Sequence, residues 1–370
     1  MTRPLVSIIV PNYQGKKIFP DCIETLLKQN LKRLQIVFVD DCSTDGSFSL
    51  AKQLYGKKKN MVITKTSKNC GYVGAMNHGL RFCTGKYVMT SNNDITYPKN
   101  WAREMYRVVK GKKKVIGAGV HFNREPAAKK FYSNIQSGEL SAWNILNVGG
   151  GKRQLVPAEK KSGFVETVVN GIIIVPRDAI NDVLFLPNYF AYGEDIELCW
   201  RLRSRGYKVV LNTRARLNHL GGYTRKVDKN FNKKAIFHGT KNTIQNHFIF
   251  YEKKNVLKLL LPFLIIQTGI FFARPRQMFY RLKAYGWVLS HPHRIWKYRQ
   301  EMQRRRTVSD EELFHIMTYK FSGPEGRFAS LFSFINILTR HYYKLVGIKT
   351  FDIDGCVTPK IDVLAVQYKP

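Results

Sequence analysis

The sequence predicts an α/β fold with a mostly parallel sheet flanked by helices, followed by a mainly helical, basic C-terminal region. Two observations in the first hundred residues support it. Short apolar runs alternate with segments whose apolar residues recur at helical spacing. Each apolar run also ends in a cluster of polar residues. This strand–helix alternation is typical of parallel strands joined by right-handed crossovers.

The elements follow one another without a visible repeat. Strands are expected at residues 6–10, 35–39, 61–66, 87–89 and 115–120. Helices are expected at residues 18–29, 48–55, 72–82 and 101–109.

Beyond residue 120 the pattern weakens. Residues 121–164 lack periodicity and predict insertions and loops, and a strand is expected at 165–175. A helix begins near Glu194 and ends before Gly206, a strand follows at 207–211, and residues 215–219 lead to Gly221 and Gly222. The expected organisation is a domain at 1–225, a basic helical region at 226–345 and a tail at 346–370.

Asp94 follows the apolar run 87–89 and has Asn92 and Asn93 as neighbours. Ligands bind at the carboxyl ends of strands in open α/β sheets. A Mg²⁺ ion takes few protein carboxylates and leaves its other positions to water and phosphates. Asp94 therefore fits a metal held mainly by a diphosphate. An ordinary turn that caps the next helix remains an alternative.

Other strand ends carry residues suited to a nucleotide. Tyr13 offers a flat face for a base, and Asp41 can accept a hydrogen bond from a pyrimidine N3–H. Residues 69–71 and Gly74 allow close approach of the backbone to a ligand. A tight loop with incidental aromatic cover explains Tyr13 and the glycines equally well. The adjacent Asp40 and Asp41 should repel each other unless a group is bound. No GxGxxG or GxxxxGK[ST] motif is present, which disfavours a dinucleotide fold and a P-loop.

Glu194 and Asp195 fall in the first turn of a predicted helix, where the helix dipole favours ionised carboxylates. An ionised carboxylate is what a general base requires. Ordinary first-turn acidic residues are the alternative. His219 follows a strand, and a lone histidine there is more often structural than a ligand.

The chain is strongly basic, with 61 Lys and Arg against 26 Asp and Glu, a net charge of +35. Such a charge indicates a polyanionic partner: nucleic acid, an anionic membrane surface or phosphorylated substrates. The six cysteines show no metal-binding spacing and favour reduced thiols in a cytosolic setting. No apolar signal segment precedes the first strand.

Together, these residues resemble family 2 glycosyltransferases. The matching motifs are residues 6–13, residues 39–46, Asn69-x-Gly71-x-x-Gly74-x-x-Asn77, residues 91–94, Gly193-Glu194-Asp195 and His219. They occur in that family's order over residues 5 to about 222. The rhamnosyltransferase-like branch, which acts on bacterial surface polysaccharides, is the most similar.

The resemblance implies a GT-A fold and an inverting, metal-dependent transfer from a nucleotide-diphosphate sugar. A UDP- or dTDP-sugar is implied, with dTDP-rhamnose as a candidate, and the acceptor is a hydroxyl of a saccharide or a lipid-diphosphate-linked saccharide. Asp195 would be the base, and Asp94 would bind Mg²⁺ or Mn²⁺ with His219 close by. The implied donor-binding residues are Pro11, Asn12, Tyr13, Asp41, Asn69, Gly74, Asn77 and Asn92. Where the family has Asp-x-Asp this chain has Asn92-Asn93-Asp94, so a neutral, weaker ligand replaces one carboxylate and leaves metal dependence open.

Residues 226–345 hold 22 Lys and Arg against 7 Asp and Glu, a net +15. Residues 259–273 are uncharged, with basic residues on both sides. Because a membrane-spanning helix needs about 20 apolar residues, we expect an interfacial helix on an anionic membrane. A buried domain helix is the alternative. The expected location is cytoplasmic, peripheral on the inner face of the plasma membrane.

Three rival functions fit the sequence less well. A nucleic-acid binder is disfavoured because the basic residues are scattered and no RNP, KH or zinc-finger motif occurs. A metal-dependent nucleotidyltransferase would not need Glu194 and Asp195 after a long intervening region. A non-catalytic nucleotide-sugar binder would not need to retain Asp94 and Asp195.

Overall fold

The computed structural model describes residues 3–123, 141–146, 153–158, 164–167, 171–180, 182–220, 223, 227–320 and 329–354. Its strands are β1 (Val6–Asn12), β2 (Leu34–Asp40), β3 (Met61–Lys65), β4 (Tyr87–Thr90), β5 (Ile95–Thr96), β6 (Val115–Asn123), β7 (Ser141–Leu146), β8 (Arg153–Ala158), β9 (Phe164–Thr167), β10 (Ile173–Pro176) and β11 (Lys208–His219). Its helices are α1 (Phe19–Leu27), α2 (Ser47–Tyr55), α3 (Gly71–Leu80), α4 (Trp101–Val109), α6 (Arg177–Ile180), α7 (Glu194–Arg203), α9 (Phe231–Phe250), α10 (Lys253–Ala273), η1 (Pro275–Gln277), α11 (Met278–Ser290), α12 (Pro292–Arg304), α13 (Asp310–Phe314) and α14 (Ala329–Val346).

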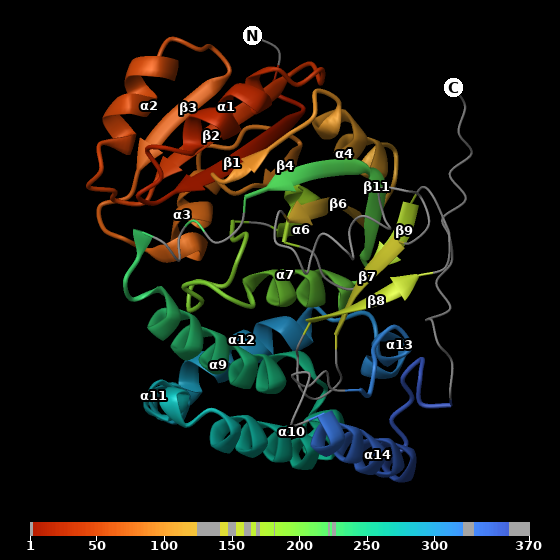
Figure 1. Ribbon diagram of the computed structural model, residues 1–370. Coiled ribbons are helices and arrows are strands. Elements are labelled where there is room, and N and C mark those ends of the chain that lie inside the picture. Colours follow the sequence, from red (N-terminus) through yellow and green to blue (C-terminus); the bar gives the residue numbers. More distant parts are fainter. Residues whose placement is uncertain are drawn as a thin grey trace.

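A nine-stranded sheet forms the centre of the described fold. Its strand order is β3-β2-β1-β4-β10-β6-β11-β5, with β9 paired to β11 (Figure 1). The first four strands in this order run parallel, as do β6 and β11. β10 enters antiparallel between β4 and β6. The predicted α/β class, with its mostly parallel sheet and a helical C-terminal region, is confirmed.

Helices cover both faces of the sheet. One core cluster joins the sheet to α1, α2 and α4, through buried side chains such as Phe19, Ala51 and Trp101. The other cluster joins the opposite face to α3, α6, α7 and the C-terminal helices, through Val73, Trp200 and Phe250. Figure 1 shows α7 between the sheet and the layer formed by α9, α10 and α12. The C-terminal region therefore packs on the fold through α7.

Two expectations beyond residue 120 were wrong. The single strand predicted at 165–175 is two strands, because β9 pairs with β11 whereas β10 lies between β4 and β6. The region predicted as loops contains the end of β6 and the hairpin of β7 and β8, although the glycines at 149–151 lie outside the described residues. The strand predicted at 207–211 is the first part of β11, which continues to His219 with a shift of register between Leu211 and Arg216.

The C-terminal helices include one, α10, that is long and apolar enough to cross a membrane by length and composition alone. About a third of that segment is buried in the described structure. Of the predicted tail, residues 346–354 are described and its remaining residues are not. Asp352 holds the described part to α13's C-terminal side by accepting hydrogen bonds from Thr318 Oγ1 and Tyr319 N.

Candidate active site

A cleft of about 700 Å³ lies at the carboxyl ends of β1, β2 and β4 and at the N-terminal ends of α7 and α9. This volume suits a small-molecule ligand. Nine of the predicted site residues line it: Pro11, Asn12, Tyr13, Asp41, Asn69, Asn92, Asp94, Asp195 and His219. These residues are up to about 200 positions apart in sequence, and the sheet edge brings them together.

Asp41 holds the start of α3 as well as lining the cleft. Its carboxylate accepts hydrogen bonds from Gly71 N at 2.8 Å, from Cys70 N at 2.9 Å and from Thr66 Oγ1 at 2.8 Å. Burial raises the pKa of Asp41 above its ordinary value, although these hydrogen bonds oppose the shift. Asp41 therefore shapes the loop at 69–71 before any ligand binds.

Asp40 is satisfied within the protein. Its carboxylate accepts from Asn12 Nδ2 at 3.0 Å and from Ser43 N at 2.9 Å, and Asn12 Oδ1 accepts in turn from Asn93 Nδ2 at 2.8 Å. A Cβ on Gly15 would come within 2.3 Å of both Asn12 and Asn93, so only glycine leaves room for this network. Protein donors therefore compensate Asp40, but its charge still contributes to the raised pKa of Asp41, so relief of this pair by a bound group stays a prediction.

Asp94 and His219 meet because β5 pairs antiparallel with β11. The pairing sets His219 opposite Ile95, and His219 Nε2 lies 3.0 Å from Asp94 Oδ1. Leu220 N also donates to Asp94 O at 2.9 Å. A carboxylate and an imidazole on the cleft wall fit a divalent cation whose other ligands come from water and phosphate. Within the described part of the chain, no cluster of three His, Cys, Asp or Glu provides a complete metal cage.

Asp195 enters the cleft from the first turn of α7, as predicted. The turn before α7 is left-handed at two consecutive residues, Tyr192 (φ 69°) and Gly193 (φ 88°). This geometry is costly for a tyrosine and needs support from its surroundings. Asp195 Oδ1 accepts from Ile196 N at 2.9 Å. Its Oδ2 lies 3.8 Å from the place that a Cβ on Gly171 would take, which is ordinary van der Waals contact, so Gly171 borders the carboxylate.

Support for this turn comes from α9. Asn242 Nδ2 donates to Ala191 O at 2.9 Å and to Tyr192 O at 2.6 Å. Lys241 Nζ donates to Asn188 O at 2.6 Å, and burial lowers the pKa of Lys241 to about 8. We call residues 188–193 the catalytic loop, because it leads directly into Asp195.

The polar face of α9 that makes these contacts is absent from the residues predicted to form the site. Its members are Lys241, Asn242, Gln245 and Asn246, all buried. Their positions i, i+1, i+4 and i+5 follow helical spacing, so a buried polar stripe was visible in the sequence. What it contacts was not visible, because the catalytic loop lies about 50 residues earlier.

Gly74 and Asn77 lie outside the residues that line the cleft. Asn77 Oδ1 accepts from Leu184 N at 3.0 Å and Phe185 N at 3.1 Å, and its Nδ2 donates to Phe185 O at 2.7 Å. A Cβ on Gly74 would lie 2.2 Å from the Cβ of Cys70. The structure thus gives both residues packing roles rather than places beside a nucleotide.

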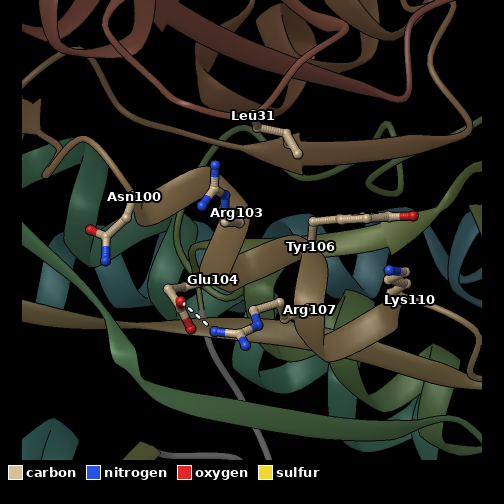
Figure 2. A pocket seen from close by; sticks show the side chains of 7 residues that line it. All are labelled: Leu31, Asn100, Arg103, Glu104, Tyr106, Arg107 and Lys110. Carbon is tan, nitrogen blue, oxygen red and sulfur yellow. Dashed lines mark hydrogen bonds and ion pairs between the residues drawn. The ribbon is translucent and has the colours of Figure 1, made fainter. Parts of the chain in front are cut away.

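A second hollow, of about 420 Å³, lies along α4 on another part of the surface (Figure 2). It is lined by Arg103, Arg107 and Lys110, and Figure 2 shows Glu104 paired with Arg107 at 3.0 Å. Glu104 also accepts a hydrogen bond from Asn212 Nδ2 at 3.2 Å. No strand-end carboxylate lines this hollow, so the first cleft is the candidate active site.

Comparisons with known proteins place this geometry in context. Residues 7–166 match the family model described as Glycosyl transferase family 2. Glycosyltransferase GlyG of Streptococcus pneumoniae is 27% identical over 148 residues, which are 39% of this chain and 49% of GlyG. A Methanococcus voltae dolichyl N-acetyl-alpha-D-glucosaminyl phosphate diacetamidodideoxyglucuronosyltransferase is 26% identical over 249 residues, 63% of this chain and 71% of the relative. The chain thus spans about half the length of the first relative.

Solved structures share the fold. Residues 1–349 of S. aureus TarS superpose with a TM-score of 0.50 at 15% identity, covering 87% of this chain and 97% of that one. GalNAc-T7, crystallised with UDP, GalNAc and Mn²⁺, superposes with a TM-score of 0.50 at 12% identity, covering 59% of this chain and 43% of that one. At these identities the likeness establishes a shared architecture.

Proposed function

Because residues 7–166 match the model of glycosyl transferase family 2 and the chain is similar to curated glycosyltransferases, we propose that it transfers a sugar, with inversion, from a nucleotide-diphosphate donor to an acceptor hydroxyl. The observation that carries this proposal is one cleft that holds a base candidate, Asp195, and a metal-ligand pair, Asp94 and His219. Sugar transfer by single displacement needs a base on the acceptor side and positive charge on the leaving side.

The nucleotide side of the cleft is formed by the ends of β1 and β2. Tyr13 is half-buried and offers its ring to a base, and Asp41 offers a carboxylate oxygen to a pyrimidine N3–H. Pro11 and Asn12 form the adjoining wall, with Asn69 and Asn92 at its edges. A pyrimidine donor such as a UDP- or dTDP-sugar, dTDP-rhamnose among them, fits these groups.

The charge of the cleft favours a metal-dependent reaction in spite of the neutral Asn92. Among the described residues, five carboxylates line it, those of Asp41, Asp94, Glu194, Asp195 and Asp228, against a single lysine. That lysine, Lys234, is paired with Asp228 at 2.9 Å. A diphosphate would be repelled by this wall without a cation. Asp94 and His219 would hold Mg²⁺ or Mn²⁺, which supplies the positive charge that stabilises a departing nucleotide diphosphate.

Asp195 would act as the general base. Asp195 lies in the first turn of α7, where the helix dipole favours an anionic side chain, and its carboxylate would accept the proton of the acceptor hydroxyl as the oxygen attacks the anomeric carbon. Glu194 precedes Asp195 on the same helix and therefore projects about 100° away. We assign Glu194 a supporting role. Direct attack by the acceptor, with no covalent sugar intermediate, inverts the anomeric configuration.

For the acceptor, we propose a saccharide or a lipid-diphosphate-linked saccharide used in cell-surface polysaccharide synthesis. The name of the Methanococcus voltae relative describes a dolichyl phosphate acceptor, which supports a lipid-linked substrate. Synthesis on such an acceptor would occur in the cytoplasm, at the inner face of the plasma membrane.

The test is a thermal-shift screen of the purified chain with UDP, dTDP, UTP and dTTP, each with and without Mg²⁺ or Mn²⁺. A ligand that binds only the folded state at about 100 times its Kd adds about 2.7 kcal/mol of stability. We expect one diphosphate to stabilise the chain only when the cation is present, and Asp94→Ala to abolish that effect. No stabilisation by either nucleotide would refute the proposal, and stabilisation by triphosphates alone would favour a nucleotidyltransferase.

A further inference from the structure

Exposed apolar side chains are concentrated in the C-terminal helices. Among the described residues, 13 of the 17 large hydrophobic side chains that are exposed lie between Leu257 and Leu345. α10 contributes Leu257, Leu261, Leu264, Ile265 and Phe272, whose exposed fractions run from 48% to 69%. Exposure on this scale marks an interaction surface rather than scattered surface residues.

The exposed residues of α10 lie on one side of the helix. Their spacing of i, i+4, i+7, i+8 and i+15 follows the helical period. The opposite side packs inward, where Leu259, Phe263 and Ile266 are buried. Phe263 stacks on His247 of α9 with ring centroids 4.3 Å apart. α10 is thus anchored to the protein along one side and bare along the other.

α14 extends the same kind of surface. Phe334, Ile337, Leu338 and Leu345 are exposed by 52% to 84% and share one side of the helix. Tyr342 Oη of α14 donates to Lys258 O of α10 at 2.9 Å, which joins the two helices. Figure 1 shows both along the edge of the molecule farthest from the sheet. We call the exposed side chains of α10 and α14 the apolar face.

The surroundings of the apolar face are basic. Residues 253–300 contain ten Lys and Arg and no Asp or Glu. Lys253, Arg274 and Arg276 are exposed at the two ends of α10. Lys254 is partly neutralised, because it pairs with Glu311 at 2.9 Å.

We propose that the apolar face docks the enzyme on an anionic lipid bilayer, with α10 and α14 lying in the interface. Exposed Leu and Phe side chains enter the boundary between headgroups and acyl chains, and the basic ends of α10 contact anionic headgroups. The net positive charge around α10 favours this occupant over a second copy of the chain, since two net positive surfaces repel each other even though Lys254 pairs with Glu311 and Lys344 of α14 pairs with Asp354. We infer that α10 lies on the membrane and does not span it, because a spanning helix would lose its packing against α9.

The experiment uses the full chain and sucrose-loaded vesicles of phosphatidylcholine alone or of phosphatidylcholine and phosphatidylglycerol at a 7:3 ratio. We expect binding to the mixed vesicles that weakens as NaCl rises from 50 to 500 mM, and little binding to phosphatidylcholine. The double variant Leu261→Glu/Leu264→Glu should bind more than tenfold more weakly. The matched control Leu54→Glu, at a leucine of α2 that is 46% exposed, should bind like the original chain.

A second variant isolates the electrostatic contribution. Replacing Arg274 and Arg276 by Gln should weaken binding about fivefold per residue at low salt, and circular dichroism should show unchanged thermal unfolding. Equal binding to both vesicle types, or full binding by the Leu261→Glu/Leu264→Glu variant, would overturn the proposal. A dimer that this variant converts to a monomer would identify a second copy as the occupant. Retention of the chain on membranes through both high salt and carbonate would instead indicate a spanning helix.

Discussion

Asn77 has two possible roles: it could bind the nucleotide donor, or it could stabilise the fold through internal hydrogen bonds. The family motif implies that Asn77 lies beside the nucleotide, whereas the structure occupies its side chain fully with Leu184 and Phe185. We predict that Asn77→Ala lowers the free energy of unfolding and leaves nucleotide affinity nearly unchanged.

The magnitude follows from the three hydrogen bonds that the alanine removes. At about 1 kcal/mol net for each, the variant should lose about 3 kcal/mol of stability. The loss could be larger if the N–H groups of Leu184 and Phe185 stay buried without partners. The segment should nevertheless keep its place, because Arg201 Nη2 still donates to Leu184 O at 2.7 Å and Glu197 Oε2 still accepts from Leu186 N at 3.4 Å. The cleft wall near Phe185 should therefore survive.

Urea unfolding followed by circular dichroism measures the stability, and calorimetry with UDP or dTDP in the presence of Mn²⁺ measures the affinity. Asn69→Ala is the matched control, because Asn69 lines the cleft and, among the described residues, its side chain takes part in one hydrogen bond, which Oδ1 accepts from Gly71 N at 3.1 Å. It should show the reverse pattern, with a smaller loss of stability and a larger loss of affinity. Full stability of Asn77→Ala together with a tenfold loss of affinity would show that the motif assignment is right and the structural role is wrong.

Four further predictions concern the cleft. Asp195→Asn should lower turnover by about 10²–10⁴-fold with donor affinity intact; normal turnover in this variant together with an inactive Glu194→Gln would reverse the two roles. Asp94→Ala should weaken Mn²⁺ and nucleotide binding together in calorimetry, so loss of only one would separate Asp94 from the diphosphate. Asn242→Ala removes two hydrogen bonds to the catalytic loop and should lower kcat more than it changes donor affinity, which steady-state kinetics and calorimetry would show. Burial raises the pKa of Asp41, so keeping Asp41 ionised lowers the stability of the folded state at a pH above that pKa, and this destabilisation is lost as the pH falls below it. Uridine binding should weaken over the same fall in pH, because the protonated carboxyl group is a poorer hydrogen-bond acceptor. In Asp41→Asn, uridine binding should not depend on pH.

The sequence was most informative where local patterns and sheet geometry agree. Parallel strands end at one edge, so the polar residues after β1, β2 and β4 could be expected to meet, and Tyr13, Asp41 and Asp94 do line one cleft. The motif spacing could not separate ligand contact from internal packing at Asn77, since either use requires an amide at the same place on α3. The pattern at 165–175 was equally ambiguous, because two short apolar strands with different partners look like one.

The domain boundary predicted at residue 225 lies just before α9. In the folded chain, α9 contacts residues on both sides of this boundary. On one side of α9, Asn242 fixes the backbone of the catalytic loop at Ala191 and Tyr192. On another, His247 stacks on Phe263 of α10, whose outer side carries the apolar face. A single helix of 20 residues therefore contacts both the loop that positions Asp195 and the helix proposed to meet the membrane. Because a helix resists bending, docking of the apolar face would set the direction in which the cleft opens relative to the bilayer. For a lipid-linked acceptor this is a geometric requirement, since its reactive hydroxyl must reach Asp195 while its lipid stays in the membrane.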